Sequence, residues 1–167
     1  MRVAALIMAV VLAQPASAEE VVFDPAPLAD CWARYERSIS CVGEGSGPCM
    51  KATSFGASNR GMTACLAAEL EWWQTLMLSL LDDLRTAEAA FDAAPPGPGV
   101  HDPPSARAGL ERTHALWEAW AAARCEYEVI ALLGSTLLGP VSVGCRLELT
   151  RAQVDFLAGQ LRAHANR

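Results

Sequence analysis

Six cysteines are distributed along this 167-residue chain: Cys31, Cys41, Cys49, Cys65, Cys125 and Cys145. An even number of cysteines behind an N-terminus that reads as an export signal predicts disulfides, because reducing thiol pools would keep the same residues reduced in the cytosol. Disulfides limit which segments can be neighbours, since the two Cα atoms must lie within about 7 Å. The fold must therefore bring these positions together in pairs.

The N-terminal residues have the three parts of a secretory signal peptide, namely the charged start at Arg2, the apolar run 3–13 and the small residues 16–18. We expect cleavage after Ala18. The apolar run is about half the roughly 20 residues that span a membrane, and no later segment replaces it. The first mature residue would be Glu19 and not a cysteine, which argues against a lipid anchor. The sequence predicts a protein that is periplasmic or secreted, and soluble once the signal is removed.

Cleavage would leave residues 19–167, a length that one compact domain with its own hydrophobic core fills. We therefore expect a single domain, with its core over about residues 31–161. Loss of Arg2 makes the net charge one unit more negative than the −6 of the whole chain, and Lys51 is the single lysine. Phosphate binding needs clustered cations, so no nucleic-acid partner is expected. An acidic surface would speed encounter with a basic partner, or serve solubility alone.

An apolar stripe with alternating spacings of four and three residues predicts a helix of about seven turns. Its members are Leu66, Leu70, Trp73, Met77, Leu80, Leu84, Ala87 and Phe91. The intervening polar residues, Glu69 among them, mostly fall off the stripe. Ser58 or Asn59 is the expected cap.

The rest of the chain predicts further helices and no strand. Residues 94–104 hold five prolines and two glycines and form a turn. A second long helix is expected from about Ser105 to Leu133, and a third from the glycine-containing break 134–144 to near the C-terminus. A shorter helix is expected from Pro27 to Ile39. The sequence thus predicts an all-α, disulfide-stapled up-and-down bundle of three to four helices, because every amphipathic face must be covered.

Six cysteines allow fifteen pairings, and sequence alone does not choose among them. A bond between Cys125 and Cys145 would close the glycine-containing loop onto its own base. Cys49 and Cys65 flank the connection that enters the long helix and form the next pair. Cys31 and Cys41 remain for each other, which requires the first helix to break near residues 38–40, because ten residues of straight helix span about 15 Å. The alternative pairs Cys31 with Cys49 and Cys41 with Cys65.

Two segments carry a resemblance to a known family. They are CMKATSFGASNRGMTACLAAELEWW at 49–73 and LERTHALWEAWAAARCEYE at 110–128, followed by a Gly-Ser loop and CRLELT at 145–150. Together they resemble the family of small exported domains named after the lysozyme inhibitor LprI, over about residues 31–161. The residues that match the family pattern are Cys49, Met62, Cys65, Leu110, Trp117, Cys125, Gly134, Ser135, Cys145, Thr150 and Leu157.

The chain departs from the family pattern at polar positions. The family usually has Asp-x-x-Leu-Asn in the long helix, Gln before the Trp, Arg-Asp after it and Arg after the last Thr. This chain instead has Gln74, Met77, Leu78, His114, Ala121, Ala122 and Gln153. Two explanations stay open: an internal ion-pair network replaced by apolar packing, which can be neutral for stability, or a binding surface that this member has lost.

No pattern of catalytic, cofactor-binding or metal-binding residues is found, and we do not expect an enzyme. His114 and Glu118 lie one helical turn apart, but no further ligand has suitable spacing, so an ordinary surface pair is the better interpretation. Asp82 and Asp83 are adjacent on a helix and point about 100° apart, unlike a glycosidase pair. Trp73, Trp117 and Trp120 lie on apolar stripes and are expected in the core. Trp32 and Trp72 are the better candidates for recognition.

Two functional hypotheses follow. The resemblance implies an inhibitor that binds a basic, lysozyme-type muramidase, with the loop 134–144 entering the substrate cleft through Gly134, Ser135, Thr136 and Leu137. A loop held by a disulfide would lose little entropy on binding. The other hypothesis is a structural or adaptor module of the cell envelope without lysozyme activity, because likeness of fold does not carry function by itself.

Overall fold

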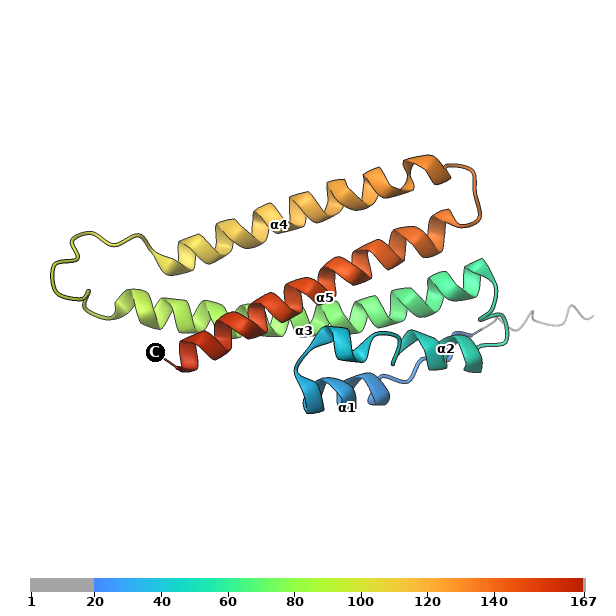
Figure 1. Cartoon of the computed structure of the whole chain (residues 1–167), viewed down its shortest axis with the longest axis horizontal. Helices are drawn as coiled ribbons and strands as arrows, with labels where there is room; N and C mark the ends of the chain where they lie inside the picture. The colour runs from blue at the N-terminus through green and yellow to red at the C-terminus, as the bar shows by residue number, and fades with distance from the viewer. Residues whose placement is uncertain (1–19, 167) are drawn as a thin grey trace, which may run out of the picture.

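The computed structural model describes residues 20–166, and these form helices and turns without any β-strand. Three long helices, α3 (Asn59–Ala93), α4 (Ala106–Val129) and α5 (Leu138–Ala165), run up and down in succession (Figure 1). The shorter α1 (Ala26–Tyr35), the 3-10 turn η1 (Ser38–Cys41) and α2 (Ser46–Ala52) lie along one side of them. A second 3-10 turn, η2 (Ile130–Leu132), continues α4. The predicted all-α, disulfide-stapled bundle is confirmed.

The predicted signal peptide and its cleavage point after Ala18 lie outside the described residues. From residue 20 to residue 166, no helix is long and apolar enough to cross a membrane.

The longest helix, α3, begins and ends where the sequence indicates. The Ser58 hydroxyl accepts a hydrogen bond of 3.0 Å from the Gly61 amide and thus satisfies one of the free N–H groups of the first turn. Gly61 is required there, because a Cβ at this position would lie 2.1 Å from the Phe55 carbonyl oxygen. At the other end, Ala94 adopts extended backbone, as the residue before a proline does.

The hydrophobic core lies between α3 and α5 and also takes in residues of α1 and α4. The buried α3 residues are Leu70, Trp73, Met77, Leu81 and Leu84. Leu81 thus occupies the place predicted for Leu80, which is half-buried, and Phe91 is exposed. A straight helix turns about 20° relative to a strict seven-residue repeat over each heptad, so a stripe spaced by alternating fours and threes rotates away from the core.

The first helix is shorter than the predicted span 27–39. It ends at Tyr35, because Glu36 takes a left-handed conformation with φ 48° and reverses the chain into η1. The break therefore falls just before the predicted position at 38–40. The Asp155 carboxylate of α5 holds the new turn, accepting hydrogen bonds from the Ser38 amide (2.8 Å) and the Ser38 hydroxyl (2.7 Å).

The last helix begins earlier than predicted. The break expected over 134–144 is confined to its first residues, since α5 starts at Leu138 and includes Gly139, Pro140 and Gly144. Pro140 is tolerated because it stands in the first turn, where its missing N–H has no helical partner to lose. Gly139 has a packing role: a Cβ there would lie 2.7 Å from the Thr63 hydroxyl of α3.

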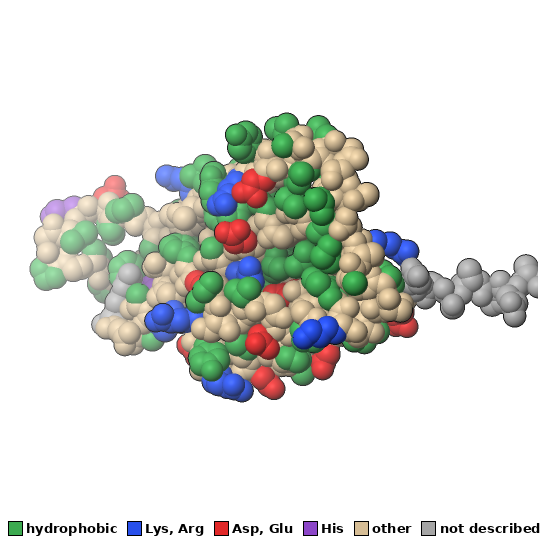
Figure 2. Space-filling model, turned by 45° about the vertical axis from the view of Figure 1, so that its right-hand side comes forward, with side chains coloured by type: hydrophobic (Ala, Val, Ile, Leu, Met, Phe, Trp, Pro, Cys, Tyr) green, Lys and Arg blue, Asp and Glu red, His purple; other side chains and the backbone are tan. Residues whose placement is uncertain are grey.

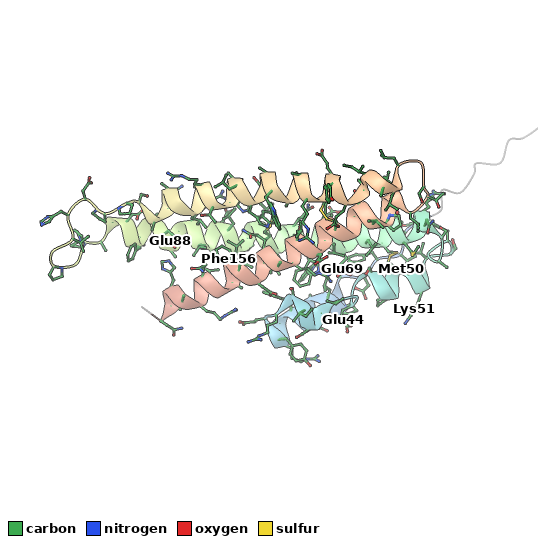
Figure 3. All side chains as sticks on the ribbon, turned by 45° about the horizontal axis from the view of Figure 1, so that its top comes forward. Glu44, Met50, Lys51, Glu69, Glu88 and Phe156 are labelled. Carbon is green, nitrogen blue, oxygen red and sulfur yellow. A yellow bond between two sulfur atoms is a disulfide. The ribbon has the colours of Figure 1, made fainter. Side chains whose placement is uncertain are left out.

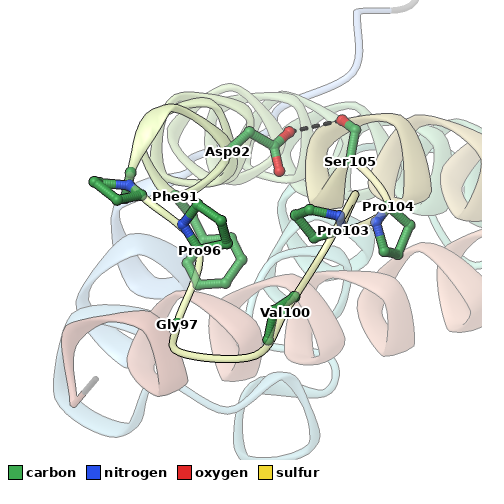
Figure 4. Close-up of a pocket in the computed structure, with 10 residues that line it drawn as sticks. Phe91, Asp92, Pro96, Gly97, Val100, Pro103, Pro104 and Ser105 are labelled. Carbon is green, nitrogen blue, oxygen red and sulfur yellow. Dashed lines mark hydrogen bonds between the residues drawn. The ribbon is translucent and has the colours of Figure 1, made fainter.

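The turn between α3 and α4 is rich in proline, as predicted, and is held at its base by one carboxylate. Asp92 accepts hydrogen bonds from the Ser105 hydroxyl (2.6 Å) and from the amides of Ala106 (2.7 Å) and Arg107 (3.1 Å). These bonds, that of Ser105 first, lower the pKa of Asp92 below its ordinary value. The turn encloses an apolar hollow of about 370 Å³ lined by prolines and Val100 (Figure 4).

Candidate functional site

The end of the bundle where α4 passes into α5 carries the loop that the sequence singles out. A disulfide between Cys125 and Cys145 ties the two helices together, with a Cα–Cα distance of 5.7 Å. Both cysteines are buried against Leu149, with Trp117 packed beside them, and this small cluster is separate from the main core. The two cysteines are 20 positions apart, and the segment between them therefore forms a closed unit on a rigid base.

The loop itself, which we call the tip loop, comprises only residues 133–137, because α5 starts at Leu138. Gly134 takes a φ of +82°, a left-handed conformation that glycine adopts without strain. The Ser135 amide then donates to the Leu132 carbonyl at 2.9 Å, and the Ser135 hydroxyl accepts from the Leu137 amide at 3.1 Å. These local bonds fix the backbone on both sides of Ser135.

The predicted interaction residues do not all point the same way. Gly134, Ser135, Thr136 and Leu137 are all exposed. Thr136, however, accepts a hydrogen bond of 2.8 Å from the side-chain amide of Asn59 at the start of α3. Thr136 therefore anchors the loop to the bundle, and the side chains left free for contact are the apolar ones.

An apolar surface surrounds the tip loop. Leu133 is 73% exposed and Leu137 is 47% exposed, and Ile130 and Val141 are exposed on the adjoining turns. Figure 2 shows hydrophobic side chains gathered along the upper edge of the molecule, over this end of α4 and α5. Large apolar side chains that share one exposed edge are typical of a contact surface.

The other disulfides secure the N-terminal elements. Cys31 pairs with Cys41 and fastens η1 to α1, and Cys49 pairs with Cys65 and fastens α2 to α3, each with Cα atoms 5.7 Å apart. All three pairings are those preferred from the sequence, and the alternative of Cys31 with Cys49 is not formed.

A buried carboxylate at a position predicted to lie off the apolar stripe joins these N-terminal elements to the bundle. Glu69 has no exposed surface and accepts hydrogen bonds from the Ser46 amide (2.7 Å) and the Trp73 indole N–H (3.2 Å) (Figure 3). The Arg151 guanidinium of α5 lies 3.9 Å away. A buried charge needs such partners. The sequence does contain an indication that Glu69 is buried: it lies four residues before the buried Trp73, and this spacing puts both residues on one face of the helix.

The positions where the chain departs from the family pattern meet between α3, α4 and α5. Gln74, Met77, Ala121 and Ala122 line one shallow groove of about 250 Å³. Gln153 is buried and Leu78 is exposed. Of the positions that depart from the family pattern, Met77, His114 and Gln153 are thus buried in the packing, whereas Gln74, Leu78 and Ala122 lie on the surface.

His114 is not the surface residue expected. Its Nε2 atom lies 3.6 Å from the Glu118 Oε1 atom, so the two residues form the predicted pair. The His114 ring, however, is buried and stacked on Trp117, with 5.6 Å between the ring centroids. The reason is that position 114 falls on the face of α4 that packs inward. Within the described residues, no group of three or more His, Cys, Asp or Glu is arranged to hold a metal. Asp82 pairs with Arg85 at 2.8 Å on the surface.

The burial of the tryptophans differs in part from the prediction. Trp73 is fully buried, as predicted, and Trp117 is half-buried. Trp32 and Trp72, the recognition candidates, pack edge-to-face on Trp73 with ring centroids at 5.7 and 4.9 Å, and both are partly buried at the edge of the core. Trp120 was expected in the core, and this is wrong: it is 51% exposed, because it lies on the face of α4 directed away from the bundle.

Comparison with known proteins identifies a family. A family model described as lysozyme inhibitor LprI matches residues 49–157, well over half of the chain. No curated protein and no solved structure matches. The matched span begins at Cys49 and ends at Leu157, so it includes two of the three disulfides and the tip loop.

Proposed function

Because the chain belongs to the LprI lysozyme inhibitor family, we propose that it binds a lysozyme-type muramidase and blocks its substrate cleft with the tip loop. The observation that carries the proposal is the combination of exposure and fixation at this loop. Leu133 and Leu137 are exposed, while the Cys125–Cys145 disulfide and the bond from Asn59 to Thr136 hold the backbone beneath them. A loop that is already ordered loses little entropy on binding.

We propose further that the protein acts outside the cytosol as a single domain of residues 19–167, after cleavage behind Ala18. The pairing of all six cysteines supports an oxidising compartment. One main core shared by α1, α3, α4 and α5 supports a single folding unit.

The net charge would then act on the association rate, and the apolar tip loop on the dissociation rate. The net charge of −6 for the whole chain favours encounter with a basic enzyme and raises the association rate most at low salt. The apolar tip would supply the part of the contact that slows dissociation, since fully desolvated apolar anchors dominate most interfaces.

The test is a lysis assay with bacterial cell walls, purified lysozymes and the oxidised mature protein. Leu133→Ala combined with Leu137→Ala should weaken inhibition at least about tenfold, equivalent to roughly 1.4 kcal/mol of binding free energy. The matched control is Ile39→Ala on η1, which is 74% exposed, like Leu133, and lies on another element. Circular dichroism should show both variants folded.

Two results would contradict the proposal. Absence of inhibition with every lysozyme tested would favour a structural or adaptor role in the cell envelope. Equal loss of inhibition in the tip variant and the Ile39→Ala control would show that the tip loop is not the contact.

A further inference from the structure

Helix α4 carries two apolar faces on opposite sides. The inward face packs on the bundle and holds Leu110, His114, Trp117, Ala121 and Cys125. The outward face, which we call the α4 seam, consists of Leu116, Trp120, Ala123 and Tyr127 of α4 and continues to Ile130, the first residue of η2. Their spacings are four, three, four and three residues, and at 100° per residue they stay within about 40° of one line.

The α4 seam is exposed to solvent, with the Arg124 guanidinium 5.6 Å from the centre of the Trp120 ring at its middle. Leu116 is 65% exposed, Trp120 51%, Tyr127 76% and Ile130 61%. Single exposed apolar side chains are ordinary, whereas a continuous line of them marks an interaction surface. A seven-residue apolar repeat is in addition the pattern with which one helix packs along another. The seam therefore fits a partner that is itself a helix.

The charges beside the seam indicate which helix. Arg112 and Glu126 are two heptads apart and flank the seam on the same side, with the small Ala119 midway between them. Both charged residues are exposed, and neither has an ion pair within the part of the chain that the structure describes. Two charges of opposite sign placed symmetrically about a small residue are self-complementary when the helix is reversed.

A second copy of α4 satisfies this arrangement in one orientation only. In an antiparallel pair, the register that sets Leu116 against the partner subunit's Trp120 also sets Arg112 against the partner subunit's Glu126. Two-fold symmetry then repeats both contacts. In a parallel pair, the residues facing Arg112 and Glu126 across the seam would be a tryptophan and an alanine, and no charge would be matched.

We propose that the α4 seam is a self-association surface on which two copies of the chain pack antiparallel, with Ala119 near the two-fold axis. The tip loops then lie at opposite ends of the dimer. This inference rests on the outward face of α4 and the start of η2, and it does not depend on the proposed inhibition of lysozyme.

Sedimentation equilibrium of the oxidised mature protein tests the seam. The wild-type protein should show a concentration-dependent monomer–dimer equilibrium. Leu116→Glu combined with Trp120→Glu should abolish the dimer, because charges at the central layers cannot be desolvated. The matched control is Leu78→Glu on α3, at a position that is 53% exposed, and it should leave the equilibrium unchanged. A wild-type protein that stays monomeric up to about 0.5 mM, a concentration above most functional dissociation constants, overturns the proposal.

A charge exchange tests the orientation. Arg112→Glu and Glu126→Arg should each raise the dimer dissociation constant about fivefold or more, because each variant opposes like charges twice. The two substitutions together should return it to within about twofold of wild type. Oxidation of an Ala119→Cys variant should give a disulfide-linked dimer, which is expected only where this position meets itself at the axis. Failure of the exchange to restore dimerisation overturns the antiparallel register.

Discussion

Helix α4 is joined to α3 by the proline-rich turn and to α5 by the tip loop, and these two connections are held in different ways. The tip loop spans five residues and is held by a covalent bond between α4 and α5. The proline-rich turn between α3 and α4 is about twice as long, has no covalent link and depends on Asp92 and the stiffness of its prolines. The comparison teaches that the short loop is closed by a crosslink, whereas the longer turn is closed by hydrogen bonds and prolines, although both ends carry exposed apolar side chains.

Removal of the Cys125–Cys145 disulfide should lower the stability of the protein more than any other change at these two connections. Cys125→Ala with Cys145→Ala opens a 20-residue loop and should lower the free energy of unfolding by about 3 kcal/mol, because the unfolded chain regains loop entropy. Urea denaturation followed by circular dichroism measures the change. A loss below about 1 kcal/mol would mean that packing of Trp117 and Leu149 closes this end without the disulfide.

At the proline-rich end, Ser105→Ala should cost about 1 kcal/mol, since it removes the cap of α4 and one of the hydrogen bonds to Asp92. The same denaturation experiment gives the value. Ser58→Ala, which removes the equivalent cap of α3, serves as the reference for an ordinary helix start. A much larger loss from Ser105→Ala would show that the turn rivals the disulfide in importance.

Glycine substitution separates backbone conformation from packing. An added Cβ meets no atom within 4 Å at either Gly134 or Gly97, and only Gly134 has a positive φ. Gly134→Ala should therefore destabilise the protein by about 1 kcal/mol, whereas Gly97→Ala should change its stability by less than about 0.5 kcal/mol. Thermal denaturation compares the two. Equal effects would mean that the tip loop is no more constrained than the proline-rich turn.

The smallest effect concerns pH. The pKa of Asp92 is lowered below its ordinary value of 3.8, chiefly by the bond from Ser105. Its folded pKa is below its unfolded pKa, so its contribution to stability is complete above the unfolded value and is lost as pH falls through the folded one. The stability gap between the wild type and Asp92→Asn should accordingly narrow below about pH 4. Acid titration of both proteins measures it, and a gap that is constant with pH would exclude the carboxylate charge as its source.

Much of the fold follows from local patterns in the sequence. The prolines after Ala94 end α3 whatever the rest of the chain does, and Ser58 and Ser105 cap the helices that follow them. For the cysteines the sequence indicated a preferred set of pairs and not a unique one: Cys49 with Cys65 and Cys125 with Cys145 each flank a connection, and Cys31 and Cys41 were paired as the remainder. The start of α5 was misplaced because a proline and glycines suggest a break, although a proline is harmless in a first turn and Gly139 is needed for contact with Thr63.

The candidate site could be predicted only in part. The tip loop was located, since the cysteines on either side of it indicate a closed hairpin. Its length, however, depends on the start of α5 at Leu138, and the anchoring role of Thr136 depends on a contact with Asn59, 77 residues away. Glu69 and Trp120 were misplaced for a related reason. Whether a helix face is covered depends on which elements pack there, and a periodic pattern on α4 with two apolar faces does not say which one the bundle uses.

The order of the disulfides has a consequence for how the protein is made. Each cysteine pairs with the next one along the chain, first with second, third with fourth and fifth with sixth. A polypeptide that enters an oxidising compartment from its N-terminus presents each cysteine together with its native partner before the next pair arrives. Short loops also close at lower entropic cost than long ones. Correct oxidation can therefore proceed in step with translocation, without reshuffling of mispaired cysteines.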